Sequence, residues 1–260
     1  MDVGAHIEAL DQDGRLLATA AAQAGLRAPV PSCPGWQVRD LLRHTSHVHR
    51  WATRFVAEGL AEAAPEPSEA EILAAGPPDA DLLDWFRAGH AGLVGALAAA
   101  APDLACWTFL PASSPRAFWA RRQAHETAIH RVDAELAAGG AATLVSPEFG
   151  TDGIDELIMG FFGRDGRQLS AEQRAGRRQR ILVRATDAGG EWLLELTEDG
   201  RLAATVRRGG GTADCTLAGP AAGLYLLLWN RAEPAAADVT VAGAEAVLRS
   251  WRDGMRVTWR

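Results

Sequence analysis

The chain has 260 residues and a formal net charge of −7 at pH 7, so it is long enough for one large domain or two modest ones, and a nucleic-acid partner is disfavoured. Its composition is that of a globular protein, and its apolar runs are far shorter than the roughly 20 residues that span a bilayer, so we expect no membrane segment. The cysteines, Cys33, Cys106 and Cys215, are far apart and odd in number, which favours a reducing cytoplasm over a disulfide framework.

Residues 1–165 are predicted to be mostly helical. Apolar residues at helical spacing, with glycine and proline near the ends, predict long helices over residues 5–25, 38–61, 79–101 and 114–139. The segment 64–78 is predicted to be a loop with room for a short helix. Helices of about 20 residues indicate an antiparallel four-helix bundle. A fifth helix is predicted over residues 153–162.

The pattern changes after a charged segment dotted with glycine, residues 166–180, which we interpret as a linker. Alternating apolar residues bounded by glycine turns then predict strands over residues 181–186, 191–197 and 202–207. They are followed by a predicted helix, a short strand and a second helix, over residues 219–230, 239–241 and 242–251. The sequence therefore predicts a second, small α+β domain over residues 181–260.

Histidines gather in two of the predicted helices, which hold His44, His47, His49, His125 and His130. Glu126 and His130 are four residues apart and so face the same side of their helix, where a carboxylate and an imidazole can hold one divalent metal ion. The alternative is a surface helix in which Arg122, Glu126 and His130 form weak ion pairs.

His44 is the favoured third ligand, because apolar residues flank its helical face as in a core-facing position. We interpret His47 and His49 as surface or partly buried imidazoles. His125 lies about 140° from His130 around the helix, so we interpret it as a packing residue or as one that orients a ligand. Two histidines and one glutamate from facing helices would leave coordination positions open for water or substrate, as catalytic metal sites do.

Segments in both halves of the chain resemble a known family. Residues 30–44, Val-Pro-Ser-Cys-Pro-Gly-Trp-Gln-Val-Arg-Asp-Leu-Leu-Arg-His, together with residues 48–51, resemble the first motif of the mycothiol-dependent maleylpyruvate isomerase family. Residues 118–135, which contain His-Glu-Thr-Ala-Ile-His-Arg-Val-Asp, resemble its long second motif. The tail is similar to the C-terminal domain of the family, in residues 213–219, 226–231 and 248–251.

This resemblance implies a DinB-like four-helix bundle that holds a divalent metal ion, with zinc expected, followed by a sterol-carrier-like α+β domain. The metal ligands carry over as His44, Glu126 and His130. The resemblance also implies mycothiol, a low-molecular-weight thiol of actinobacteria, as co-substrate and an electrophilic small molecule as the second partner. The implied protein is an isomerase or a thiol S-transferase, and we expect a monomer or weak homodimer. The alternative is a non-catalytic, metal-stabilised ligand-binding or regulatory protein.

Arg231 follows an apolar run, residues 226–230, and has two interpretations. It can complement the dipole at the C-terminal end of a helix. Alternatively, the small domain closes one side of a metal cleft, and Arg231 holds a carboxylate of the substrate or thiol through two parallel hydrogen bonds. Both interpretations stay open, and Arg231 is the candidate catalytic residue.

Overall fold

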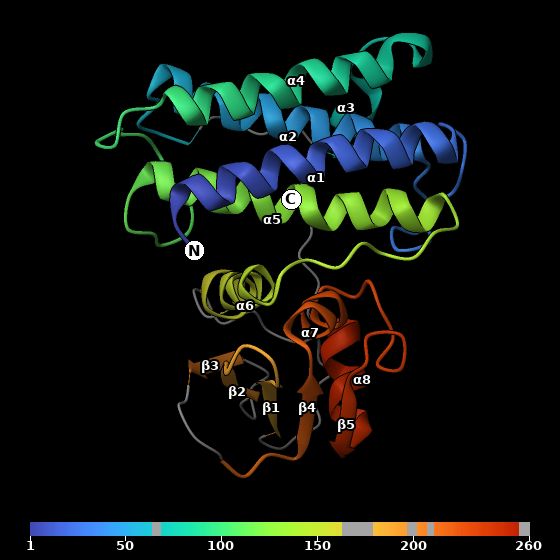
Figure 1. Cartoon of the computed structure of the whole chain (residues 1–260), viewed down its shortest axis with the longest axis vertical. Helices are drawn as coiled ribbons and strands as arrows, with labels where there is room; N and C mark the ends of the chain where they lie inside the picture. The colour runs from blue at the N-terminus through green and yellow to red at the C-terminus, as the bar shows by residue number, and fades with distance from the viewer. Residues whose placement is uncertain (64–68, 163–178, 197–201, 207–210, 255–260) are drawn as a thin grey trace. The chain divides into compact units, whose positions relative to one another are not determined.

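The computed structural model describes residues 1–63, 69–162, 179–196, 202–206 and 211–254 (Figure 1). The chain divides after Thr143 into two compact units. Residues 166–178 of the predicted linker lie outside the described residues. No helix in the described ranges combines the length and the apolar character that crossing a membrane requires.

The described helices of the first unit are α1 (Val3–Ala24), α2 (Val38–Glu58), α3 (Glu69–Ala74), α4 (Asp79–Ala99) and α5 (Pro115–Ala137). The Asp2 side chain accepts a backbone hydrogen bond at the start of α1, and Ser114 does the same at the start of α5. Gly59, with a φ of 64°, ends α2 before the predicted end at residue 61, because glycine adopts this left-handed conformation without steric cost.

The helices α1, α2, α4 and α5 form a four-helix bundle, in which α1 and α2 each pack against α4 and α5 (Figure 1). The helices α2 and α5 run antiparallel. In the first half of α2, His44 lies beside Glu126. Near the end of α2, Phe55 stacks on Trp119 with the ring centroids 5.1 Å apart. This direction brings the first half of α2 alongside the second half of α5, where the candidate ligands lie.

The prediction of an antiparallel bundle is wrong for α1 and α5, which run parallel. The ring of His6 meets the ring of His125 with centroids 6.0 Å apart, and further along both helices Asp13 pairs with Arg131 at 3.0 Å. The helices α2 and α4 also run parallel (Figure 1). Two neighbouring helices that are joined by a short loop must run antiparallel. The connection between α2 and α4 is long enough to return along the bundle, so α4 can run in the same direction as α2.

The second unit combines helices with a five-stranded sheet. Its helical segments are α6 (Pro147–Asp155), the π-helical η1 (Glu156–Phe162), α7 (Ala221–Leu228) and α8 (Glu245–Gly254). Its strands are β1 (Gln179–Ala185), β2 (Glu191–Leu196), β3 (Leu202–Val206), β4 (Cys215–Gly219) and β5 (Thr240–Gly243). The strand order is β3-β2-β1-β4-β5, with β1 and β4 parallel and the other neighbours antiparallel. The predicted fold class, helical with an α+β part, is confirmed.

Two elements of the second unit differ from the sequence expectation. The strand β4 was not predicted, although its residues alternate between buried and partly buried. The helix predicted over 153–162 starts earlier, at Pro147. The side chain of Ser146 accepts a hydrogen bond from the backbone amide of Phe149 at this end. It also packs within the second unit, where Phe162 meets the ring of Trp251 at 5.2 Å. The units therefore divide after residue 143, whereas the sequence placed the end of the helical domain near residue 165.

Candidate metal centre

His44 from α2 meets Glu126 and His130 from α5 in the antiparallel α2–α5 interface. The Nε2 atoms of His44 and His130 lie 3.2 Å and 3.1 Å from the same oxygen, Oε1 of Glu126. The three potential ligand atoms all lie within 4.8 Å of one another. The side chains of His44, His130 and Glu126 are 6%, 10% and 18% exposed, so the cluster is buried but solvent reaches its carboxylate. The structure thus brings together the three residues that the sequence singled out as ligands.

The carboxylate of Glu126 is held by Arg122, one turn earlier on α5. Nη2 of Arg122 donates to Oε2 at 2.9 Å, and this arginine is 3% exposed, so a surface helix does not describe this stretch. Burial by itself would raise the pKa of Glu126, but hydrogen bonds from His130 and His44 and the charges of His130 and Arg122 outweigh it and hold the pKa well below its usual value. Glu126 is therefore ionised, with Oε1 between the two imidazoles.

His130 has a second carboxylate partner, Asp133, through its other ring nitrogen. Nδ1 of His130 donates to Oδ2 of Asp133 at 2.8 Å, and Asp133 is fully buried. Burial by itself would lower the pKa of His130, but hydrogen bonds to Asp133 and Glu126 and the charges of both carboxylates raise it to about 9. Asp133 also accepts the hydroxyl of Ser32 at Oδ1 and the thiol of Cys33 at Oδ2, the thiol from 3.5 Å.

The loop between α1 and α2 places an indole ring against both imidazoles. The ring centroid of Trp36 lies 5.1 Å from that of His44 and 6.4 Å from that of His130, on which it stacks. Backbone hydrogen bonds from Val30 to the carbonyl of Trp36 and from Trp36 to the carbonyl of Cys33 close this loop. One side of the cluster therefore faces an aromatic ring rather than water.

The other histidines of the two helices lie outside the three-residue cluster. His49 is fully buried, with Nε2 at 2.9 Å from the hydroxyl of Thr127. His125 packs edge-on against the ring of His6, in agreement with the interpretation of a packing residue. His47 is partly buried, and its pKa is lowered by burial and by the charge of His44.

Sequence reasoning missed Asp133, Ser32 and Trp36 as neighbours of the cluster. Asp133 follows His130 by one helical turn, a spacing that indicates an interacting pair, but many surface residues share that spacing. Ser32 and Trp36 belong to a Pro-rich loop, and hydrophobic periodicity does not predict the conformation of such a loop.

Arg231 lies in the second unit, just after α7. Its Nη1 donates to the carbonyl oxygen of Trp229 at 2.8 Å, and its backbone amide donates to the carbonyl of Leu226 at 2.8 Å. These contacts satisfy carbonyl groups at the C-terminal end of α7, as the helix-terminus interpretation anticipates. The catalytic role of Arg231 stays a prediction.

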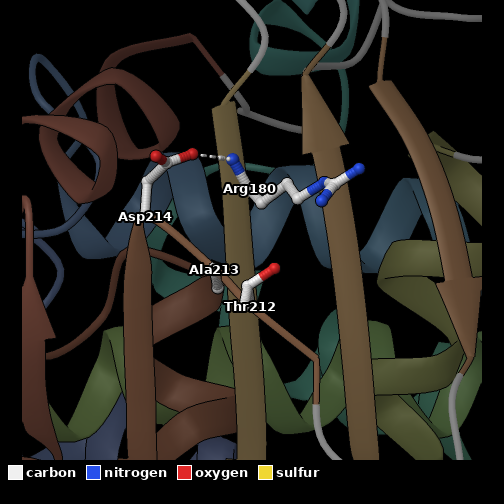
Figure 2. Close-up of a pocket in the computed structure, with 4 residues that line it drawn as sticks. All are labelled: Arg180, Thr212, Ala213 and Asp214. Atoms are coloured by element: carbon white, nitrogen blue, oxygen red, sulfur yellow. Dashed lines mark hydrogen bonds between the residues drawn. The ribbon is translucent and has the colours of Figure 1, made fainter.

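A hollow of about 330 Å³ in the second unit is lined by Arg180, Thr212, Ala213 and Asp214 (Figure 2). The Asp214 carboxylate accepts the backbone amide of Arg180 at 2.8 Å. The guanidinium of Arg180 points away from Asp214 and donates to Glu195 at 2.8 Å. Both charged groups are thus engaged within the sheet, and we place no site here.

The donor set of the α2–α5 cluster fits a divalent metal ion. Two imidazole nitrogens and one carboxylate oxygen are ligands that zinc takes in catalytic sites, at about 2.0–2.1 Å. At that bond length, donor atoms around one tetrahedral ion lie roughly 3.3 Å apart. The observed separations of 3.1 Å and 3.2 Å between Glu126 Oε1 and the two imidazole nitrogens are close to this value.

Two domain families match the chain. Residues 7–135 match the mycothiol maleylpyruvate isomerase N-terminal domain, and residues 148–250 match the MDMPI C-terminal domain. The first match lies within the helical unit and the second within the unit that holds the sheet. No curated protein matches the sequence.

Among solved structures, the chain is similar to a crystal structure of the mycothiol-dependent maleylpyruvate isomerase, with a TM-score of 0.62 and 15% identity over 93% of each chain. A histidine-to-alanine variant of that isomerase gives the same values. Identity at this level shows the fold alone. A UbiJ-SCP2 ubiquinone synthesis protein aligns with 42% of this chain and 94% of its own at 19% identity, but the TM-score of 0.28 supports no argument. The two domain matches span most of the sequence, and the chain therefore belongs to the mycothiol-dependent maleylpyruvate isomerase family.

Proposed function

We propose that this protein is a metal-dependent and mycothiol-dependent enzyme that acts on an electrophilic small molecule of the maleylpyruvate type. Membership of the family supports the use of mycothiol and the isomerase chemistry. The observation that carries the metal is the approach of Nε2 of His44 and Nε2 of His130 to one oxygen of Glu126.

A divalent cation at this cluster, with zinc favoured by the ligand set, would lower the pKa of a bound thiol and so would supply a thiolate at neutral pH. His44 and His130 would hold the cation through Nε2, and Glu126 through Oε1. Arg122 keeps Oε2 of Glu126 engaged, so Glu126 offers a single oxygen. Trp36 shields the two imidazoles from water on one side.

The thiolate forms a carbon–sulfur bond with an electrophilic carbon of the substrate, and the electron pair of the attacked double bond moves toward the adjoining carbonyl group. Addition leaves a single bond where the double bond was, and the substrate can rotate about it. When the thiolate then leaves, the double bond re-forms in the other geometry and the net result is isomerisation. When the thiol stays and the substrate takes up a proton, the result is transfer. The name of the similar enzyme favours isomerisation.

Arg231 enters this proposal as the group that holds a carboxylate of the substrate or of the thiol. The planar guanidinium has five N–H donors in a fixed fork, which suits a carboxylate better than a lysine would. The observed bond from Nη1 to the carbonyl of Trp229 orients the guanidinium.

The competing function is a non-catalytic protein in which the metal serves the fold alone. Structural zinc sites are closed by four protein ligands, whereas catalytic sites keep a position open. Within the described residues, the cluster supplies three ligands, His44, Glu126 and His130. That observation favours the enzyme.

The test is an assay of the zinc-loaded protein with mycothiol and maleylpyruvate, in which substrate and free thiol are followed together. We expect loss of the substrate without net loss of thiol, with activity abolished by a chelator and restored by zinc. Net consumption of thiol would instead indicate transfer. No turnover and no thiol consumption over a panel of electrophiles would favour the non-catalytic function.

A further inference from the structure

We infer that Asp133 is a positioning residue of the metal site, which fixes the tautomer and the orientation of His130 and ties this ligand to the loop between α1 and α2. The inference rests on the proposed metal site. Asp133 itself touches no metal. Its effect on the position of His130 can be measured separately from the loss of a metal ligand.

The tautomer follows from the chemistry of the two partners. The 2.8 Å contact joins Nδ1 of His130 to a carboxylate oxygen, which accepts the proton of Nδ1. Nε2, on the other side of the ring, is then the atom left for a cation, and its proton, which meets Oε1 of Glu126 at 3.1 Å, is the one that the cation would displace. The opposite tautomer would turn an N–H group toward the cation and could not ligate it. Asp133 therefore selects the form of His130 that binds a metal.

The position of Asp133 is itself set from outside its own helix. Its carboxylate is fully buried, and a buried carboxylate is costly unless its oxygens accept hydrogen bonds. Ser32 donates to Oδ1, while His130 and Cys33 donate to Oδ2, so both oxygens have partners. Two of the three donors lie in the loop between α1 and α2, and one lies on α5.

The same loop carries the ring that covers the site. Trp36 is tied by backbone hydrogen bonds to Val30 and Cys33, and its ring stacks on His130. Asp133 thus contacts the loop through Ser32 and the ligand through His130. Loss of this carboxylate would release His130 to rotate and would remove the anchor that seats the loop against it.

The experiment compares Asp133→Ala, Asp133→Asn and Ser32→Ala with the wild-type protein. Zinc affinity is measured by competition with a chromophoric chelator, and the absorption spectrum of the cobalt-loaded protein reports ligand geometry. Glu135→Gln is the matched control, because its carboxylate lies on the same helix but bonds to Arg131 and Thr143.

We expect Asp133→Ala to weaken zinc binding about 10- to 100-fold, the usual effect of removing a partner of a metal-bound histidine. Asp133→Asn should lose less zinc affinity than Asp133→Ala, because its carbonyl oxygen can still accept a hydrogen bond from Nδ1. Ser32→Ala should lose less zinc affinity than either variant of Asp133. The cobalt spectrum should change in Asp133→Ala and stay unchanged in Glu135→Gln. A purely structural role would weaken folding without altering that spectrum.

The outcomes separate the two proposals. If the wild-type protein binds no zinc, the metal site and this inference both fail. If the wild type binds zinc and folded Asp133→Ala binds it equally with an unchanged cobalt spectrum, the inference alone is overturned. If Asp133→Ala does not fold, Asp133→Asn and Ser32→Ala provide the test. The inference is overturned if both of these variants have the zinc affinity and the cobalt spectrum of the wild type.

Discussion

Nη2 of Arg122 donates to Oε2 of Glu126 at 2.9 Å from one turn earlier on α5, and the arginine is almost wholly buried. Removing Arg122 takes this donor from Oε2 of Glu126 and leaves part of the buried negative charge without compensation. We therefore expect Arg122→Met to lower the free energy of unfolding of the metal-free protein by about 2–4 kcal/mol. Urea denaturation measures this difference.

Arg87→Met is the control for Arg122. Arg87 pairs with Asp84 at 2.9 Å on α4, but both side chains are mostly exposed. Exposed pairs contribute at most about 1 kcal/mol, so this variant should unfold nearly as the wild type does. An equal loss in the free energy of unfolding in the two variants would contradict the inference that Arg122 forms a stabilising buried ion pair with Glu126.

Gln123 lies on α5 one turn before Glu126, and it is 1% exposed. Among the described residues, its Oε1 has no hydrogen-bond partner, and an unsatisfied buried polar atom costs about 1–3 kcal/mol. We therefore expect Gln123→Met, which keeps the length of the side chain, to leave the free energy of unfolding unchanged or to raise it by about 1 kcal/mol.

Thr127→Val gives the opposite case one turn further along α5. The hydroxyl of Thr127 pairs with Nε2 of His49 at 2.9 Å in the buried interface. Its removal leaves a buried ring nitrogen unsatisfied, so we expect a loss of about 1–3 kcal/mol. A loss in Gln123→Met as large as that in Thr127→Val would show that the amide of Gln123 is satisfied in solution.

The dependence of stability on pH should follow two buried histidines, His49 and His90, whose ring centroids lie 5.3 Å apart. Burial lowers the pKa of both, and the charge of His90 lowers that of His49 further. Above the unfolded-state pKa of about 6.5, neither state is protonated at these rings. Below it, the unfolded chain takes up protons that the folded protein excludes, so stability falls as the pH falls toward the lowered pKa values.

The variant that tests this is His49→Gln, measured without metal over a series of pH values. Each excluded proton contributes a slope of up to about 1.4 kcal/mol per pH unit, so the variant should lose stability less steeply than the wild type between about pH 6 and pH 5. Identical slopes would mean that His49 is protonated in the folded protein.

Arg231→Lys tests the proposed carboxylate contact of the second unit. Lysine keeps the charge but loses the planar fork, so we expect KM to rise about tenfold with little change in kcat. Arg249→Lys is the control, since Arg249 forms an exposed pair with Glu245 at 3.7 Å. Unchanged kinetics in Arg231→Lys would mean that Arg231 does not hold a carboxylate, and the interpretation as a helix-terminus residue of α7 would stand.

The sequence predicted the helices well, because glycine, proline and capping side chains mark their ends. It did not predict the parallel pairing of α1 with α5, since helix direction depends on how a long connection returns. The strand β4 (Cys215–Gly219) was missed because it ends in Ala-Gly, two residue types that are uncommon in strands. The spacing of Glu126 and His130 was visible in the sequence, whereas the contacts of Asp133 with Ser32 join residues 101 positions apart.

The central claim is that His44, Glu126 and His130 hold one divalent metal ion. The most direct test is the zinc content of the purified wild-type protein and of His130→Ala after equal loading with zinc and equal dialysis. We expect about one zinc ion per chain in the wild type, as for a site with three protein ligands, and a large loss in the variant. Equal zinc content in the two proteins, with the variant folded, would contradict the account.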